Sequence, residues 1–410
     1  MKFVSDLHIH SKYSRATSKD MDLAHIAKWA ALKGIDLMGT GDFTHPFWLS
    51  ELKKNLKDDG GGLFDFNGTK FMLTTEVCNI FHKDGKLRKI HTMIFAPSFK
   101  AVDKINAELS KFADLLPDGR PIFTIPTKKV AEIVFSVSNE AMIIPCHIWT
   151  PWFSIFGSNS GFDSIEECFE EYSRNIYAVE TGLSSDPSMN WRVSKLDKVS
   201  LISNSDAHSP SKIGREANVF DTALTYKGVY RAIKDKDPEK FLYTVEFFPQ
   251  EGKYHFDGHR NCKVCLSPKE TKKNKRKCPK CGRALTAGVM SRIEELADRE
   301  EGFVRKNAVP FKTLISLNEI IGQALGRSSE SAVVEKEYVN LVSRFGSEFK
   351  VLLDIPPEKL SPYVNERTLD GILRVREGKI DITPGYDGEY GKIQIFTAAT
   401  KKKESQIGLF

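Results

Sequence analysis

The chain of 410 residues has no long hydrophobic run, and its charges are close to balance. It contains no stretch of about 18 consecutive apolar residues, the length that a membrane-spanning helix needs. The first residues, "MKFVSDLH", are also too polar for the apolar core of a secretory signal. We therefore expect an intracellular protein without a membrane contact. The net charge of +6 permits a polyanionic partner without requiring one.

Cysteines are few, and their number, seven, is odd. Four of them form two C-x-x-C pairs, Cys262/Cys265 and Cys278/Cys281, which are separated by twelve residues. This pattern argues against a disulfide framework, because each short turn presents two thiolates and four thiolates make a closed tetrahedral site. We predict a structural Zn²⁺ site there. Two redox dithiols are the alternative, which the doubled pattern disfavours.

The length exceeds that of one ordinary domain, and the chain changes character near residue 250. Before that point, short apolar runs rich in β-branched residues alternate with helix-like segments, an order that predicts a parallel α/β sheet. After it come the cysteine pairs and three amphipathic, helix-like segments. We expect a first domain at 1–248 and a smaller zinc-binding and helical domain at 249–410.

Seven apolar runs of the first domain contain or end in residues that bind metals. These runs lie at 2–10, 36–45, 71–77, 89–97, 141–149, 177–183 and 199–208. In a closed α/β barrel the carboxyl ends of the strands meet at one mouth. A barrel of about seven strands would therefore bring together the candidate ligands His8, His10, Asp42, His45, Glu76, His91, His147, Asp206 and His208.

Imidazole mixed with carboxylate is a ligand set suited to Zn²⁺, Mn²⁺ or iron. Nine candidates are too many for one ion and fit two or three. Ions a few ångströms apart clamp a phosphate and activate water for in-line attack. A single buried histidine is usually an ordinary core residue, but the joint occurrence of H-x-H, D-x-x-H and D-x-H favours a metal centre.

These motifs resemble the PHP superfamily of metal-dependent phosphoesterases. "DLHIHS" is similar to its first motif, "GTGDFTH" to its second and "SNSDAH" to its last. The resemblance implies a distorted (β/α)7 barrel with a trinuclear metal centre. The second motif departs from the commoner T-D-H form, because Phe43 and Thr44 separate Asp42 from His45. The other seven candidates form the principal implied cage.

The whole chain resembles the endonuclease Q family of archaea and some bacteria, through the PHP-like motifs, the cysteine pairs, "YHFDGHRNC" and "ELADR". The resemblance implies a DNA repair endonuclease that cuts the phosphodiester 5′ to hypoxanthine, uracil, xanthine or an abasic site, leaving 3′-hydroxyl and 5′-phosphate ends. Its expected cofactors are Zn²⁺ at the cysteines and two or three Zn²⁺, Mg²⁺ or Mn²⁺ ions in the barrel. We expect such an enzyme in the cytoplasm, associated with the nucleoid.

Catalysis would use water activated by the bound metals, with His8 and Asp206 as central ligands. Arg215, just past the last motif, could stabilise the phosphate, although an ordinary loop salt bridge is an equal alternative.

Two segments are candidates for contacts with DNA. The loop at 147–162 supplies Trp149, Trp152, Phe153 and Phe156, which could stack on DNA or wall a base pocket; a small aromatic core under the loop is the alternative. Between the cysteine pairs, a basic run could contact phosphates through Lys272, Lys273, Lys275 and Arg276, although such runs are usually solvated loops.

Three other functions compete with this interpretation. One is a PHP-type phosphatase for small phosphate monoesters, against which residues 250–410 argue. Another is an exonuclease, which would need a DNA end. The third is a non-catalytic DNA-binding adaptor with a relic barrel, which should have lost some ligands. At the tail, Gln406, Leu409 and Phe410 resemble a sliding-clamp binding peptide, for which a frayed terminus is the alternative.

Overall fold

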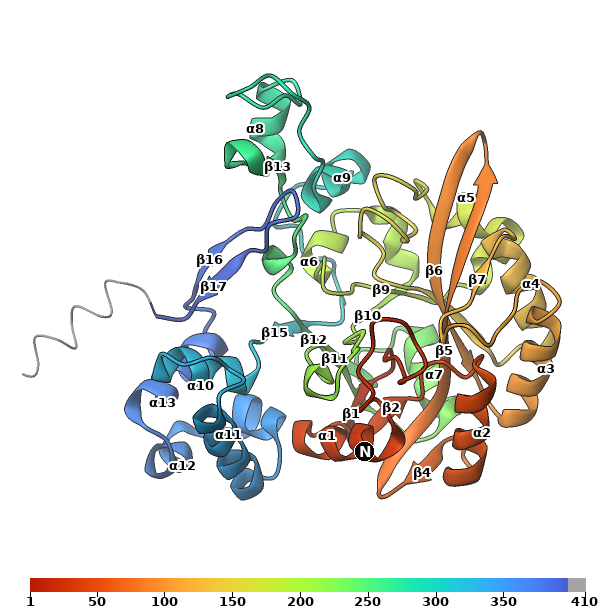
Figure 1. Ribbon diagram of the computed structural model, residues 1–410, viewed down its shortest axis with the longest axis horizontal. Helices are drawn as coiled ribbons and strands as arrows, with labels where there is room; N and C mark the ends of the chain where they lie inside the picture. The colour runs from red at the N-terminus through yellow and green to blue at the C-terminus, as the bar shows by residue number, and fades with distance from the viewer. Residues whose placement is uncertain (397–410) are drawn as a thin grey trace, which may run out of the picture.

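A computed structural model describes residues 1–396 (Figure 1). The predicted clamp-binding tail lies outside the described residues and stays a prediction. The α-helices of the described residues are α1 (Leu23–Lys33), α2 (Pro46–Asn55), α3 (Phe99–Leu109), α4 (Thr127–Val137), α5 (Ile165–Phe169), α6 (Pro187–Asn190), α7 (Tyr226–Asp235), α8 (Pro268–Lys273), α9 (Val289–Leu296), α10 (Leu317–Leu325), α11 (Ala332–Phe345), α12 (Pro357–Leu360) and α13 (Glu366–Arg376). Across residues 1–396, none of the helices has the length and apolar character needed to cross a bilayer.

The strands are short, apart from one long pair. They are β1 (Lys2–Asp6), β2 (Leu37–Gly39), β3 (Lys57–Asp58), β4 (Phe64–Phe66), β5 (Thr69–Lys83), β6 (Lys86–Ala96), β7 (Ile122–Phe123), β8 (Met142–Pro145), β9 (Ala178–Glu180), β10 (Ser200–Ile202), β11 (Ala217–Asp221), β12 (Phe241–Glu246), β13 (Asp257–His259), β14 (Val264–Leu266), β15 (Phe311–Thr313), β16 (Asp381–Thr383) and β17 (Lys392–Gln394). Each of the seven predicted apolar runs overlaps one strand, so the predicted α/β class is confirmed.

Eleven strands form one mixed sheet. Its main path runs β15-β12-β11-β1-β2-β5-β4-β3, and β6 continues from β5 to β8. β1, β2 and β5 are parallel neighbours, whereas β1–β11, β5–β6 and β6–β8 are antiparallel. The expectation of a parallel sheet is therefore wrong for these last pairings.

The antiparallel part comes from a long hairpin that the sequence analysis divided into two separate strands. β6 pairs along its whole length with the second part of β5, from Leu73–Ala96 to Lys83–Lys86. Asp84 and Gly85 make the turn with positive φ angles of 54° and 71°, the conformation that favours Asp-Gly in tight hairpins. Figure 1 shows this hairpin, in orange, projecting far beyond the rest of the sheet. Glu76 and His91 therefore lie within strands and not at strand ends.

β9 and β10 form a separate parallel pair beside β8 and β1. The Ile148 N–H, just after β8, donates to the Glu180 carbonyl at 3.1 Å, and the His10 N–H donates to the Ala207 carbonyl at 3.0 Å. The strands β1, β2, β5, β6, β8, β9 and β10 thus follow one another in space, each linked to the next through backbone hydrogen bonds at or just beyond their ends.

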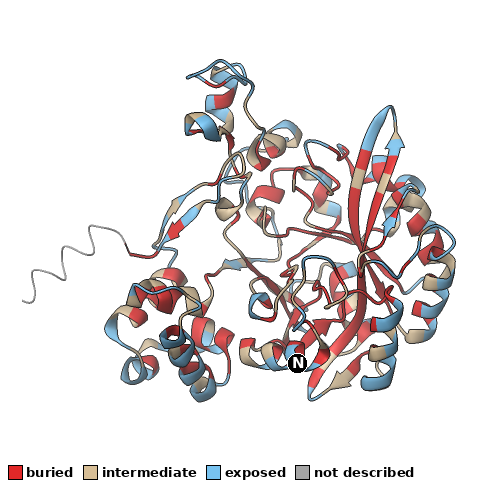
Figure 2. Ribbon diagram, viewed as in Figure 1, coloured by how far each residue is buried: buried red, intermediate tan, exposed pale blue. Residues whose placement is uncertain are grey.

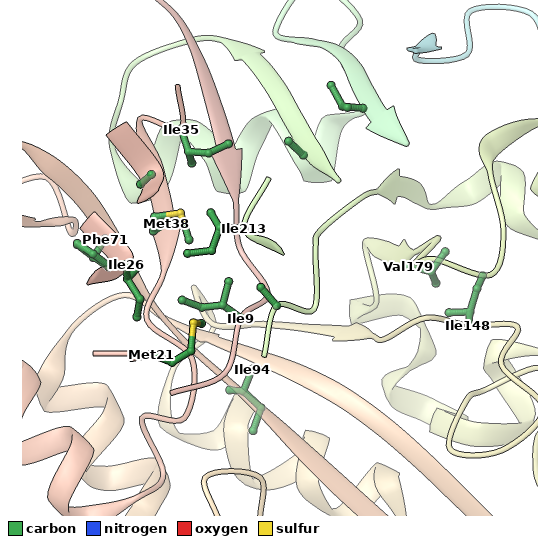
Figure 3. Close-up of a cluster of buried hydrophobic side chains, with 14 of the residues drawn as sticks. Ile9, Met21, Ile26, Ile35, Met38, Phe71, Ile94, Ile148, Val179 and Ile213 are labelled. Carbon is green, nitrogen blue, oxygen red and sulfur yellow. The ribbon is translucent and has the colours of Figure 1, made fainter. Parts of the chain in front are cut away.

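Apolar residues at helical spacing fix the helices against this sheet. In α1, Leu23, Ile26 and Ala30 are buried on one face, the Asp22 side chain caps the first turn, and Gly34 ends the helix in the left-handed region. Figure 2 shows buried residues concentrated along the strands and on the inner faces of the helices. Figure 3 shows part of this core, with Ile9 and Ile213 among its buried side chains.

Residues beyond 250 form two further groups, at the top and the lower left of Figure 1. The cysteine lobe contains β13, β14, α8 and α9, and the helical group contains α10 to α13. Between them, β15 pairs in parallel with β12 and so extends the sheet of the first half. The domain boundary near residue 248 stays a prediction.

Candidate metal centre

Seven of the nine predicted barrel ligands converge around Glu76. Its Oε2 lies 3.2 Å from His10 Nε2 and 3.9 Å from His8 Nε2. Its Oε1 lies 2.7 Å from His91 Nδ1 and 3.2 Å from His147 Nε2. One carboxylate therefore addresses two groups of imidazoles, one with each oxygen. Such an arrangement can bridge two cations.

Asp206 completes the first group and begins a third. Its Oδ1 lies 3.2 Å from His10 Nε2 and 3.7 Å from His8 Nε2. Four sets of side chains have the spacing of metal ligands here: His8, His10 and Glu76; Glu76, His91 and His147; His10, Asp206 and His208; and His8, Cys146 and Glu180.

Several of these ligand atoms are buried and make no well-oriented hydrogen bond, although polar atoms lie within 4 Å of them. They are His8 Nε2, His10 Nε2, His91 Nδ1 and Asp206 Oδ1. Buried polar atoms in native proteins nearly always have a partner, and a bound ion supplies one. Imidazole nitrogen and carboxylate oxygen are the donors that divalent ions such as Zn²⁺ and Mn²⁺ accept. The residues present therefore fit a multinuclear metal centre.

Burial and neighbouring charges act in opposite directions on the pKa values of these side chains. Desolvation by burial would lower the pKa of His8, but the carboxylates of Glu180 and Asp206 raise it well above its usual value. Burial lowers the pKa of His91 to about 4 although Glu76 lies beside it. His91 is therefore neutral near pH 7, with a lone pair available to a cation.

Glu76 itself stays ionised in this buried position. Burial opposes its charge, but the neighbouring His91 and the guanidinium of Arg120 hold its pKa well below the usual range. Arg120 Nη1 donates to Glu76 Oε2 at 2.9 Å. The sequence analysis missed Arg120, which stands in a loop before β7 and outside every recognised motif.

The backbone is left-handed at three of the nine predicted barrel ligands. The φ angles are 48° at Asp42, 30° at His147 and 47° at Asp206. Such conformations cost about 1–3 kcal/mol each in residues other than glycine, and they cluster at functional sites. The surrounding contacts must therefore hold these three loops in place.

Glu180 and Asp42 support the two histidines of the first motif from behind. His8 Nδ1 lies 2.9 Å from Glu180 Oε2, and His10 Nδ1 lies 3.0 Å from Asp42 Oδ1. A carboxylate behind a histidine fixes the tautomer and the orientation of a metal-binding imidazole. Asp42 is thus a support and not a member of the metal-spaced sets, which corrects its predicted role. Glu180 was missed, although it lies in the predicted strand at 177–183.

His45 is not part of the cluster. It stands at the N-cap of α2, where its ring accepts from the Trp48 N–H at 3.5 Å and stacks on Tyr13 with a centroid separation of 4.4 Å. The two residues that separate Asp42 from His45 carry it away from the centre and into this cap. Its prediction as a ligand is wrong.

A cavity of about 390 Å³ opens beside the cluster, between the strands of the first half and residues 249–255. His91, Arg120, His147 and Asp206 line its polar end. Arg215 does not line it: Arg215 Nε donates to the Ser205 carbonyl at 2.9 Å and Nη2 to the Asp206 carbonyl at 3.4 Å. Arg120, and not Arg215 as predicted, presents its guanidinium to this cavity.

The aromatic loop divides into two pairs. Trp149 and Phe156 are buried against each other, with ring centroids 5.0 Å apart, so their predicted contact with DNA is wrong. Trp152 and Phe153 line the cavity. Trp152 is 41% exposed, and it meets Tyr254 edge to face at 5.6 Å. The sequence of this irregular loop has no periodic pattern that would distinguish its buried aromatic residues from those that line the cavity.

The second candidate metal site is the cysteine lobe, where His259, Cys262, Cys278 and Cys281 have the spacing of ligands. Cys265 is not among them, which corrects the predicted set of four cysteines. In the β13–β14 hairpin, His259 pairs with Val264 and Gly258 with Cys265. Because successive side chains of a strand point to opposite faces, Cys265 faces away from His259.

The local charge suits a cation at this second site. Burial would raise the pKa of the Cys278 thiol, but hydrogen bonds from the backbone of Cys281 and Lys280 lower it to about 6. Cys278 is therefore largely a thiolate at neutral pH. Three cysteines and one histidine are an established ligand set for structural Zn²⁺.

The basic run has two kinds of side chain. Lys272 and Arg276 pair with Glu294 at 3.2 Å and Glu295 at 2.7 Å, and so attach the run to α9. Lys273 and Lys275 are less tightly held: Lys273 is exposed, and no ion pair is recorded for either within residues 1–396.

Comparison with known proteins gives likenesses over the whole chain and over its end. The family model described as the MJ0043 C-terminal domain matches residues 316–379. The crystal structure of a lesion-specific endonuclease, PfuEndoQ from Pyrococcus furiosus, is 33% identical; the match covers 99% of each chain with a TM-score of 0.87. A crystal structure of endonuclease Q with a 27-mer duplex carrying an abasic lesion at its active site is 34% identical; this match covers 98% of each chain with a TM-score of 0.86.

The uncharacterized protein MJ0043 of Methanocaldococcus jannaschii is 34% identical over 253 residues, which are 60% of this chain. The match spans only 31% of the length of MJ0043.

Proposed function

The chain belongs to the endonuclease Q family, and on that premise we propose that it is a metal-dependent DNA repair endonuclease. The observation that carries the proposal is the cluster in which Glu76 addresses two groups of imidazoles beside a cavity. The family premise itself rests on the likeness to endonuclease Q over 99% of both chains.

We propose that β1, β2, β5, β6, β8, β9 and β10 form the distorted (β/α)7 barrel of a PHP domain at 1–248. The backbone links between the ends of these strands support a closed ring. The zinc lobe and the helical group would form the domain at 249–410, which brings Tyr254 and His255 to the cavity.

The proposed ligands are His8, His10, Glu76, His91, His147, Asp206 and His208. Divalent ions held there would neutralise the charge of the phosphate and make hydroxide available near neutral pH. The protein would contribute fixed geometry: Glu180 orients His8, Asp42 orients His10, and Arg120 offers positive charge at the edge of the cavity. Attack on the phosphorus 5′ to the lesion would leave 3′-hydroxyl and 5′-phosphate ends.

The proposed substrates are duplexes with hypoxanthine, uracil, xanthine or an abasic site. The cavity, at about 390 Å³, has the size of a small-molecule site, and Trp152 and Tyr254 give it flat aromatic walls. A deaminated base pairs poorly, so its extrusion into such a cavity costs less than that of a normal base. Lys273 and Lys275 are candidates for phosphate contacts on the cysteine lobe.

A test of endonuclease action uses closed circular plasmid DNA. We expect the protein with Mn²⁺ to convert supercoiled plasmid that contains uracil into nicked circles, and to leave uracil-free plasmid supercoiled. An exonuclease would act only after linearisation, and a small-molecule phosphatase would hydrolyse p-nitrophenyl phosphate and spare both plasmids. Either of these patterns would contradict the proposal.

We propose that the cysteine lobe holds one structural Zn²⁺ through His259, Cys262, Cys278 and Cys281. His259→Ala should weaken zinc binding by more than the roughly 10–100-fold that is typical for loss of an outer-shell partner. Cys265→Ala is the matched control, because its thiol faces the other side of the hairpin, and it should retain the metal. Zinc content is measured by mass spectrometry after dialysis against a competing chelator. If His259→Ala keeps its zinc and Cys265→Ala loses it, the four cysteines are the ligands and this proposal is contradicted.

A further inference from the structure

Two side chains outside the metal-spaced sets cross-link the two segments that carry the first and last ligands. Asp6 ends β1, two residues before His8, and Asn204 follows β10, two residues before Asp206. Both side chains are fully buried. The segments "DLHIH" and "NSDAH" thus share one plan, with a polar residue followed by two candidate ligands at alternate positions.

The two segments run side by side in parallel register. Ile9 and Ala207 form a parallel backbone bridge, and the His10 N–H donates to the Ala207 carbonyl at 3.0 Å. Counting back three residues from Ile9 and from Ala207 places Asp6 opposite Asn204. The two polar side chains therefore stand at equivalent positions, on the strand side of the ligands.

Each polar side chain accepts a hydrogen bond from the opposite segment. Asp6 Oδ1 accepts from the Ser205 N–H at 3.0 Å, and Asn204 Oδ1 accepts from the Leu7 N–H at 2.9 Å. In both cases the donor follows the opposite polar residue directly. These two reciprocal bonds from backbone to side chain join the ends of β1 and β10, where the two strands form no backbone hydrogen bonds of a regular sheet.

Each side chain also makes a further contact with a residue close to the ligands. Asp6 Oδ2 accepts from the Gly214 N–H at 2.9 Å, which closes the segment that carries the left-handed Asp206. Asn204 Nδ2 donates to Glu180 Oε2 at 3.3 Å, and Glu180 in turn orients His8. Displacement of either side chain would therefore shift ligands on both segments.

We propose that Asp6 and Asn204 are positioning residues that hold the His8/His10 segment and the Asp206/His208 segment in register for metal binding. This inference rests on the proposed function, because it assigns these two side chains to the geometry of the proposed metal centre. It extends that function by naming residues that touch neither metal nor substrate.

The test is metal affinity measured without DNA. Free Mn²⁺ is followed by electron paramagnetic resonance during titration of the full chain after removal of its metals and restoration of zinc. Asn204→Ala should weaken Mn²⁺ binding at least about tenfold, the effect expected for loss of an outer-shell partner. Asp6→Asn should give a smaller decrease, because its amide oxygen still accepts from Ser205 while the contact with Gly214 is lost.

Asn190→Ala is the matched control. Asn190 is also fully buried, and its side chain makes hydrogen bonds with Trp149, Ser185 and Asp186, away from the two ligand segments. It should lower the thermal midpoint in EDTA about as much as Asn204→Ala but keep wild-type Mn²⁺ affinity. Equal loss of affinity in both variants would show a general folding effect and overturn the inference.

The remaining outcomes separate this inference from the function on which it rests. Wild-type affinity in Asn204→Ala overturns the positioning role while the metal centre stands. If Asn204→Ala does not fold, the smaller decrease in Asp6→Asn decides, and no decrease overturns the inference. Wild-type protein that binds no Mn²⁺ beyond its zinc overturns the proposed function and the positioning role together.

Discussion

Glu76→Gln should reduce incision of a uracil-containing duplex by at least about 10³-fold, which corresponds to ~4 kcal/mol of transition-state stabilisation. The reason is geometric: Oε2 faces His8 and His10 while Oε1 faces His91 and His147. An amide keeps the size of the side chain but removes its charge and one of its two acceptor oxygens. The variant should therefore hold fewer barrel ions. Initial rates on an end-labelled duplex and metal content by mass spectrometry check both effects.

Glu246→Gln provides the matched control. Glu246 is equally buried, and burial raises its pKa to about 8, so its carboxyl is largely protonated at pH 7. An amide resembles a neutral carboxyl, and this position is outside the metal-spaced sets. Its activity should stay within a few-fold of wild type. Substantial incision by Glu76→Gln with a full complement of ions would refute the bridging role.

Removal of Glu348 should lower the free energy of unfolding by about 3–5 kcal/mol, the cost of leaving a buried charge without its partner. Lys33 at the end of α1 and Glu348 beside the helical group are both almost fully buried, and they form an ion pair at 2.7 Å. The Tyr338 hydroxyl and the Leu317 N–H also donate to Glu348, at 2.8 Å and 3.0 Å. This pair therefore attaches the helical group to the first half of the chain.

Glu348→Met removes the carboxylate and leaves the Lys33 ammonium buried beside the Trp29 and Tyr338 rings. The double variant with Lys33→Met removes both charges, and it should recover most of the lost stability, since apolar replacement of a whole buried pair is often neutral. Urea unfolding followed by tryptophan fluorescence measures both variants.

The exposed pair Lys53–Asp103, at 2.6 Å, is the control. Asp103→Ala should cost less than about 1 kcal/mol, because solvent screens surface pairs. A cost for Glu348→Met as small as that for Asp103→Ala would show that the buried pair does not attach the helical group.

Most residues of the candidate metal centre were predictable from sequence because metal chemistry restricts residue type and spacing. His8 with His10 and Asp206 with His208 stand at alternate positions just beyond the ends of β1 and β10, where the loops of such a sheet converge. The prediction of His45 as a ligand was wrong, because the two residues between Asp42 and His45 place it at the N-cap of α2. The prediction of Cys265 as a zinc ligand was wrong, because the alternation of side chains in β14 turns its thiol away from His259 despite the short spacing to Cys262.

The residues that sequence reasoning missed act through contacts between distant segments. Arg120 meets Glu76 across 44 positions, and Asn204 meets Leu7 across 197. A local sequence pattern cannot predict contacts between segments so far apart, and an arginine or asparagine in a loop gives no signal on its own. The hairpin of β5 and β6 was predictable, since Asp84-Gly85 between two apolar runs is a strong turn signal.

The most direct measurement is the position of the cut on end-labelled duplexes that carry one uracil, one hypoxanthine or one abasic site, with Mn²⁺ present. We expect a single break on the 5′ side of each lesion, with a 3′-hydroxyl that a polymerase can extend. We expect no break in undamaged duplex and none with Asp206→Ala. Cleavage that ignores the lesion, or cleavage that Asp206→Ala retains, would contradict the assignment of this centre to lesion-directed DNA incision.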